Sequence, residues 1–154
     1  MKYIITIQLC LFCLFINAQE LTLDQLTSFI NQPLNTIHKN LEVKGWALKP
    51  ELSAFNGNQL YQTYAFGKLA TDETQALAWF RIHAFKDVVK QVYYQLPGLD
   101  AYEKLLKQLK SVSTLTQNGQ SIEDKQIGTL YENKDYNFQT LVGGGSYTLM
   151  VTTK

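Results

Sequence analysis

The chain has 154 residues, with 14 basic and 13 acidic side chains and a formal net charge of +1. This balance argues against a nucleic-acid-binding protein, because such proteins carry an excess of Lys and Arg on one face. Arginine occurs once, at Arg81, which argues against a multi-site clamp built from bidentate Arg contacts to carboxylates or phosphates.

The first 18 residues predict a secretory signal peptide. Lys2 supplies a positive charge, residues 3–16 form an almost wholly apolar run, and Ala18 offers a small-residue cleavage point. The apolar run is shorter than the ~20 residues that span a bilayer. We expect cleavage after Ala18 and a secreted or periplasmic chain of residues 19–154 with no stable membrane insertion. A membrane anchor or a buried strand are the alternatives for this run.

Both cysteines, Cys10 and Cys13, lie within the predicted signal peptide. The mature chain would therefore hold neither a disulfide nor a thiolate metal ligand. Neither cysteine follows a small residue, so lipidation is not expected. Residues 19–154 are long enough to form one domain with a substantial core.

A capping box begins the first predicted helix, with Thr22 as the N-cap and Gln25 reaching back. Pro33 lies inside the helical pattern and predicts a kink or a split, because it removes one amide donor. Gly45 suits the left-handed conformation that ends a helix. The apolar residues that form one helical face between these points are Leu26, Ile30, Leu34, Ile37 and Leu41.

After Gly45 the apolar period changes from about 3.6 to 2, which predicts strands. We expect strands at 46–48, 59–68, 76–85 and 88–96, a turn within 51–58, a polar connection at 71–74 and a tight link at 86–87. The strand at 76–85 carries apolar residues on both faces, so we expect it to be central or partly covered on both sides.

A second helix is predicted to begin at a capping box formed by Asp100 and Glu103 and to continue to about Lys110. A strand at 112–116, ended by Asn118-Gly119, follows it. Further strands are expected around 127–131, 136–142 and 147–151, and these last three read as an antiparallel meander.

The order of helix, about four strands, helix and about four strands predicts an α+β fold. We interpret it as two α-β4 units, at 21–96 and 98–154, within a single domain. The expected architecture is an antiparallel sheet with helices on one face. Neither unit is expected to be stable alone, because one short sheet with one helix buries little apolar surface.

Three segments resemble a group of uncharacterised secreted proteins of Bacteroidetes bacteria: residues 21–26 (LTLDQL), residues 41–46 (LEVKGW) and the end of the signal at 17–20 (NAQE). The helix at 102–110 extends the likeness over most of the chain. The element order also resembles the tandem α-β4 layout of beta-lactamase-inhibitor-like proteins. That resemblance implies a saddle-like sheet with helices behind it, and it transfers no inhibitory loop or site residue.

No residue pattern predicts a catalytic site, a cofactor or a bound metal. His38 and His83 are expected on a helix surface and a sheet face without carboxylate neighbours, which does not make a metal site. The glycines at 143–145 precede a strand and predict a hairpin turn, and no Gly-x-Ser-x-Gly elbow occurs. The carboxylate pairs Asp72-Glu73 and Glu123-Asp124 are expected in loops, as charges exposed to solvent and not as a catalytic pair.

Aromatic residues are dense along the predicted strands. If the helices cover one face of the sheet, the other face presents Tyr61, Trp79, Arg81, His83 and Tyr93, or their neighbours, to solvent. Tyr, Trp and Arg are enriched at the energetic centres of protein interfaces. The alternative is that these aromatics fill cores and cross-strand pairs.

We therefore expect a secreted or periplasmic binding protein without enzymatic activity or cofactor. Its aromatic-rich sheet face, with the five candidate residues, and its hairpin loops would contact another protein or an envelope component, in an inhibitory or immunity-like role. The first alternative is a carrier that holds a small apolar ligand between sheet and helices. The second is a hydrolase, which would need His83 within hydrogen-bond reach of a serine or a carboxylate.

Overall fold

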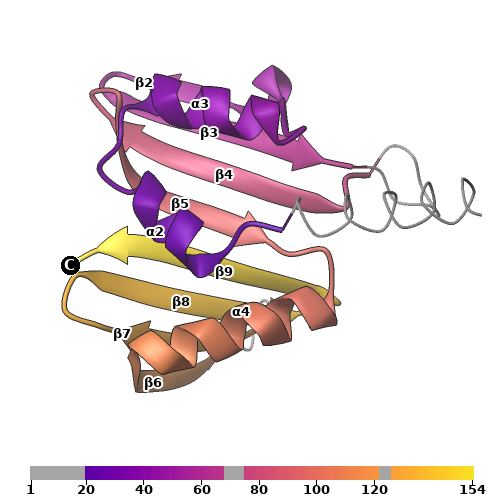
Figure 1. Cartoon of the computed structure of the whole chain (residues 1–154), viewed down its shortest axis with the longest axis vertical. Helices are drawn as coiled ribbons and strands as arrows, with labels where there is room; N and C mark the ends of the chain where they lie inside the picture. Colours follow the sequence, from indigo (N-terminus) through magenta and orange to yellow (C-terminus); the bar gives the residue numbers. More distant parts are fainter. Residues whose placement is uncertain (1–19, 68–74, 122–125) are drawn as a thin grey trace, which may run out of the picture.

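The computed structural model describes residues 20–67, 75–121 and 126–154 (Figure 1). The predicted signal peptide with Cys10 and Cys13 lies outside these residues, as do the 71–74 connection with Asp72-Glu73 and the Glu123-Asp124 pair. Across the described ranges the protein combines α-helices with a large antiparallel sheet, which confirms the mixed α+β class.

The α-helices within the described residues are α2 (Leu23–Phe29), α3 (Leu34–Val43) and α4 (Leu99–Val112). The strands before α4 are β1 (Ala47–Leu48), β2 (Ala54–Asn56), β3 (Gln59–Phe66), β4 (Ala78–Phe85) and β5 (Val88–Gln95). A short 3-10 helix, η2 (Pro50–Leu52), lies between β1 and β2. The strands after α4 are β6 (Thr114–Ser121), β7 (Gln126–Glu132), β8 (Tyr136–Gly143) and β9 (Ser146–Thr153).

All these strands pair antiparallel in one nine-stranded sheet, in the order β1-β3-β4-β5-β9-β8-β7-β6, with β2 also on the outer edge of β3. β4 lies inside the sheet, and the predicted meander of the last three strands is confirmed. We call β1–β5, which precede α4, the early strands and β6–β9, which follow it, the late strands. The two groups join where β5 pairs with β9, from Gln91↔Thr152 to Gln95↔Thr148. The early group holds five strands and the late group four, so the element order alone does not establish a duplication.

Pro33 splits the first helical segment in two, as its sequence position predicts. The capping box at the start of α2 is present: the Gln25 backbone N–H donates to Thr22 Oγ1 at 3.3 Å, and the Thr22 backbone N–H donates to Gln25 Oε1 at 3.1 Å. Between the helices, Asn31 adopts a left-handed φ of 64° and its N–H donates to the Val89 carbonyl. The α2–α3 connection is therefore fixed to the start of β5.

Gly45 ends α3 in the left-handed conformation expected from the sequence, with a φ of 82°. The N–H of Gly45 donates to the Glu42 carbonyl at 2.9 Å, and that of Trp46 donates to the Leu41 carbonyl at 3.0 Å. These two bonds satisfy carbonyls that the helix leaves unpaired, in the pattern of a Schellman motif. They also direct Trp46 back into the core, where it is 2% exposed.

Three sequence-based boundaries are wrong. Asp100 is not the N-cap of α4, because the helix begins at Leu99 with Gly98 as a cap that provides no side-chain acceptor. β6 does not end at Asn118-Gly119, since the ladder with β7 continues to Ser121↔Gln126. The segment 51–58 is more than a turn, because it contributes to η2 and contains β2.

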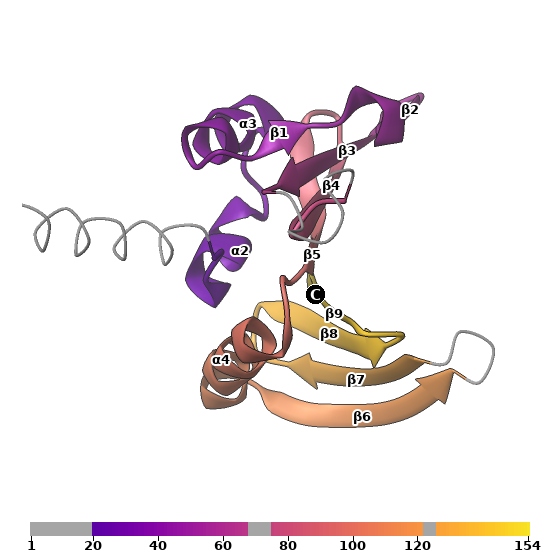
Figure 2. The same ribbon diagram turned by 90° about the vertical axis from the view of Figure 1, so that its right-hand side faces the viewer.

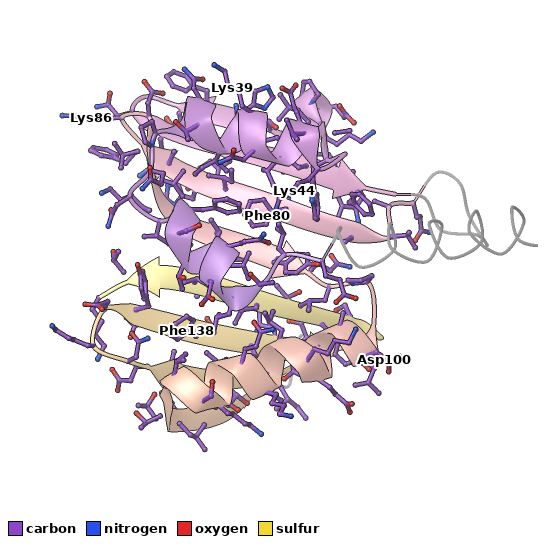
Figure 3. All side chains as sticks on the ribbon, in the orientation of Figure 1. Lys39, Lys44, Phe80, Lys86, Asp100 and Phe138 are labelled. Atoms are coloured by element: carbon purple, nitrogen blue, oxygen red, sulfur yellow. The ribbon has the colours of Figure 1, made fainter. Side chains whose placement is uncertain are left out.

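The α-helices α2, α3 and α4 lie on one side of the sheet, and an apolar core fills the space between these helices and the sheet (Figure 2). Phe80 of β4 and Phe138 of β8 are both fully buried in this core (Figure 3). Residues 20–23, at the start of the described chain, contact α4, because the Leu23 N–H donates to Gln108 Oε1 and Lys104 pairs with Glu20 at 3.6 Å. Within the three described ranges, no helix combines the length and the apolar character that crossing a membrane requires.

Candidate binding site on the helix-free face

The face of the sheet opposite α2, α3 and α4 is called here the helix-free face. Side chains alternate between faces along a strand, so the residues that lie between the buried ones point to the opposite face. In β4, Phe80 and Ile82 point to the core and are fully buried, whereas Trp79, Arg81 and His83 point the other way. The prediction that these three residues share one face is confirmed.

Pairing between strands places all five sequence-predicted residues on the helix-free face. Tyr61 of β3 lies opposite His83, and Tyr93 of β5 lies opposite Arg81. The rings of Tyr61 and His83 stack with centroids 4.4 Å apart and planes within 10°. Arg81 is exposed, and the four ring residues are half-buried, so they neither form a core nor stand free in solvent.

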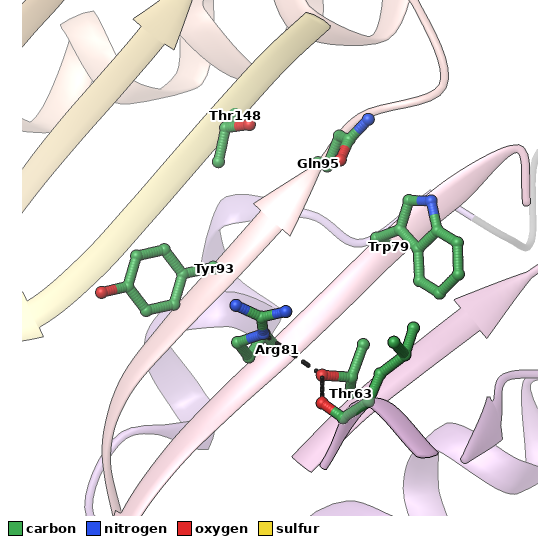
Figure 4. A pocket seen from close by; sticks show the side chains of 7 residues that line it. Thr63, Trp79, Arg81, Tyr93, Gln95 and Thr148 are labelled. Carbon is green, nitrogen blue, oxygen red and sulfur yellow. Dashed lines mark hydrogen bonds between the residues drawn. The ribbon is translucent and has the colours of Figure 1, made fainter. Parts of the chain in front are cut away.

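Three of the five residues surround a surface hollow of about 350 Å³ (Figure 4). Tyr61 and His83 form a separate stacked pair beside it. The hollow draws its side chains from β3, β4, β5, β9 and η2, and its lining residues are Leu52, Thr63, Trp79, Arg81, Tyr93, Gln95 and Thr148.

One wall of the hollow is an excursion of the chain between β1 and β2. Both strands pair with β3, but the chain between them leaves the edge and forms η2, which brings Leu52 to the hollow. Backbone groups stay paired, because the Lys49 N–H donates to the Thr63 carbonyl and the Thr63 N–H donates to Ser53 Oγ. A side-chain hydroxyl thus replaces the missing strand partner.

Arg81 is held by a two-bond chain at the base of the hollow. Its Nε–H donates to Thr63 Oγ1 at 3.2 Å, and the Thr63 hydroxyl donates to the Leu52 carbonyl at 2.8 Å. Thr63 is 3% exposed, so this anchor is shielded from water. Over the ranges that the structure describes, Arg81 forms no salt bridge.

The electrostatics of the hollow are set by Arg81 and Tyr93. Burial raises the pKa of the Tyr93 hydroxyl, and the neighbouring Tyr61 adds to this, whereas the positive charge of Arg81 acts in the opposite direction. Tyr93 therefore stays neutral over the physiological range. The hollow has one permanent positive charge and no carboxylate among its lining residues.

Four lining residues are absent from the sequence-based candidates. Thr63 and Gln95 follow Tyr61 and Tyr93 at the strand period of two, so alternation alone could have found them. Thr148 reaches the hollow because β9 pairs with β5, a contact between distant segments that no local pattern signals. Leu52 reaches it through the η2 excursion, which interrupts strand periodicity.

On the helix side, His38 belongs to a hydrogen-bonded chain. Its Nε2 lies 3.2 Å from Glu42 Oε1, and its Nδ1 lies 3.2 Å from the Tyr64 hydroxyl, which in turn contacts Gln62 Oε1. The expectation of a surface histidine without a carboxylate neighbour is wrong, because Glu42 lies one helical turn further on. Tyr64 is fully buried, so the chain links α3 to β3 and does not present its hydroxyl to a substrate.

His83 has a different environment. Its Nε2 is buried and has no hydrogen-bond partner in the described part of the chain. Nor do those parts contain a group of three or more His, Cys, Asp or Glu side chains that could hold a metal ion.

No protein-family model, curated protein or solved structure matches this chain. A functional proposal therefore has to be based on the geometry of its own residues.

Proposed function

We propose that this is a non-catalytic binding protein that contacts another protein through the helix-free face. The observation that supports this proposal most strongly is the hollow between Trp79, Arg81 and Tyr93. It combines half-buried aromatic rings with an anchored, exposed guanidinium, which is the residue chemistry of strongly contributing interface positions. Binding would block a surface of the partner, as in an inhibitory or immunity-like role, and needs no cofactor.

The alternative of a small-ligand carrier is less well supported. A small hollow lies between the sheet and the helices, where a carried ligand would be held. Its volume is about 50 Å³, and its lining residues include Leu21, Tyr94 of β5 and Leu105 of α4. Pockets for small ligands usually measure ~300–1,000 Å³. The large side chains Trp46, Phe80 and Phe138 instead fill the core.

Location and internal organisation belong to the same proposal. The predicted signal peptide favours a secreted or periplasmic protein whose partner is exported or part of the envelope. A two-unit origin, with 21–96 and 98–154 as related α-β4 units, is favoured by the helices that precede each group of strands.

The test is capture of a partner from envelope extract with the full chain and with a Trp79→Ala/Tyr93→Ala variant. The control variant Gln139→Ala/Thr152→Ala alters the same face on β8 and β9, away from the hollow. We expect the Trp79→Ala/Tyr93→Ala variant to bind the partner ~30-fold more weakly, which corresponds to a loss of about 2 kcal/mol of binding free energy. We expect the control variant to bind the partner as the parent does. Equal recovery with all three proteins would exclude the hollow as the contact.

A further inference from the structure

The hollow has an electrostatic feature that the proposed function does not use. Arg81 is the one arginine of the chain, and its guanidinium carries a positive charge. It is exposed, it lines the hollow, and it forms no salt bridge within the parts of the chain that the structure describes. A partner that fits this site must bring the negative charge.

The orientation of the guanidinium indicates which kind of anion it can bind. Nε is used by the bond to Thr63 Oγ1, and the Thr63 hydroxyl is itself directed by its bond to the Leu52 carbonyl. This leaves the two terminal nitrogens, which carry four N–H donors in one plane, for an incoming group. Such a fork matches the two oxygens of a carboxylate. Because the fork is already held in place, binding costs little side-chain ordering.

The surroundings of the fork indicate what carries the carboxylate. Trp79 lies two residues before Arg81 on β4, and Tyr93 lies opposite Arg81 on β5, so aromatic rings flank the guanidinium (Figure 4). A C-terminal residue holds its carboxylate and its side chain on the same Cα, so it can bring both to the fork and the rings at once. An Asp or Glu side chain that pairs with the fork would instead place only its methylene groups against the rings. The polar groups of Gln95 and Thr148 lie at the same hollow.

We propose that the hollow binds the C-terminal carboxylate of a protein partner whose last residue is apolar or aromatic. The carboxylate pairs with the terminal nitrogens of Arg81, and the last side chain packs against Trp79 and Tyr93. This inference rests on the proposed function, since it names the part of the partner that the helix-free face contacts.

The probe for this inference is N-acetyl-phenylalanine, which mimics an aromatic C-terminal residue. Its neutral amide, N-acetyl-phenylalaninamide, lacks the charge, and N-acetyl-glutamate with an amidated α-carboxyl mimics an acidic side chain. The indole N–H signals in NMR titrations provide the readout. Trp79 lies at the hollow, whereas Trp46 is buried in the core and reports whether the fold is retained. We expect the acid to shift the Trp79 signal and to bind at least about tenfold more tightly than either other probe.

Variants of the anchor sharpen the test. Arg81→Gln should reduce binding of the acid to the level of the amide, and Arg81→Lys should give an intermediate value because it keeps the charge without the fork. Thr63→Val, of similar size, should weaken the acid several-fold because it removes the hydroxyl that holds Nε. Equal binding of acid and amide, tighter binding of the glutamate derivative, no binding of the acid, or an acid preference that survives Arg81→Gln with an unchanged Trp46 signal would each overturn the inference.

The capture experiment separates failure of this inference from failure of the proposed function. If Trp79→Ala/Tyr93→Ala loses a partner that Arg81→Gln retains, the helix-free face binds a protein but does not recognise a carboxylate. If neither variant loses the partner, the proposed function itself fails.

Discussion

At the scale of single residues, Tyr94 is expected to make stability depend on alkaline pH. Burial raises the pKa of its hydroxyl to about 12, although a hydrogen bond with the Leu21 backbone acts in the opposite direction. An unfolded tyrosine ionises at about pH 10. The folded state therefore holds the proton more tightly, so this contribution is complete below about pH 10 and is lost as the pH rises to about 12.

The variant Tyr94→Phe should remove that dependence. At about pH 11 the ionisation of Tyr94 should have cost the parent about 1 kcal/mol of unfolding free energy relative to neutral pH, a loss that the variant does not share. Urea denaturation at several pH values between about 8 and 11 measures the two slopes. Parallel curves for parent and variant would show that Tyr94 ionises equally in the folded and unfolded states.

Residue-level reasoning from the sequence succeeds where the cause is local. Alternation along β4 places Trp79 and Arg81 on the same face, because a strand repeats every two residues. The contact between His38 and Glu42 is also local, since the two residues lie four apart on α3, so the spacing alone could have predicted it. The contact between His38 and Tyr64 could not be predicted in this way, because it requires α3 to pack on β3. Local reasoning also fails for Leu52 and Thr148, which reach the hollow through an excursion and a long-range strand pairing.

At the scale of elements, the ends of helices show which boundaries a sequence can specify. Thr22, Pro33 and Gly45 each act through their own backbone or side-chain chemistry, and the structure confirms all three. Asp100 satisfied the pattern of a cap, but the cap of α4 is Gly98, two residues earlier. Gly119 suggested a strand end, yet pairing with β7 carries β6 past it. At Gly119, tertiary pairing thus overrides turn propensity.

Two glycines that flank helices should respond in opposite ways to substitution. Gly45→Ala should lower the unfolding free energy by about 1 kcal/mol, because its φ of 82° is strained for any side chain. An added Cβ would lie 3.5 Å from Phe66, an ordinary contact, so the cost is conformational. Gly98→Ser should instead raise stability by a few tenths of a kcal/mol, because its backbone is extended and Ser supplies the missing cap.

Thermal and urea unfolding of the two variants provide the measurement. If Gly45→Ala has no effect, the left-handed end of α3 is not needed for the docking of Trp46.

At the scale of the whole molecule, the continuous core implies that the early and late strands unfold together. Both tryptophans, Trp46 and Trp79, lie in the early part of the chain, whereas Phe138 is fully buried in β8. Phe138→Ala should lower the unfolding free energy by about 3–5 kcal/mol. If the molecule is one cooperative unit, the tryptophan fluorescence transition should shift by the same amount as the far-UV circular dichroism transition. A fluorescence transition that stays in place would mean that the early part unfolds independently.

The two edges of the sheet differ in a way that limits self-association. The outer edge of β3 is divided between β1, with two residues, and β2, with three, and η2 interrupts it. β6, with eight residues, is the last strand at the opposite edge. A long open edge can accept a strand from another molecule, whereas a short and interrupted one offers few aligned backbone groups. Two copies joined through β6 would expose interrupted edges at both outer ends, so strand-by-strand growth into a fibre would stop at a pair.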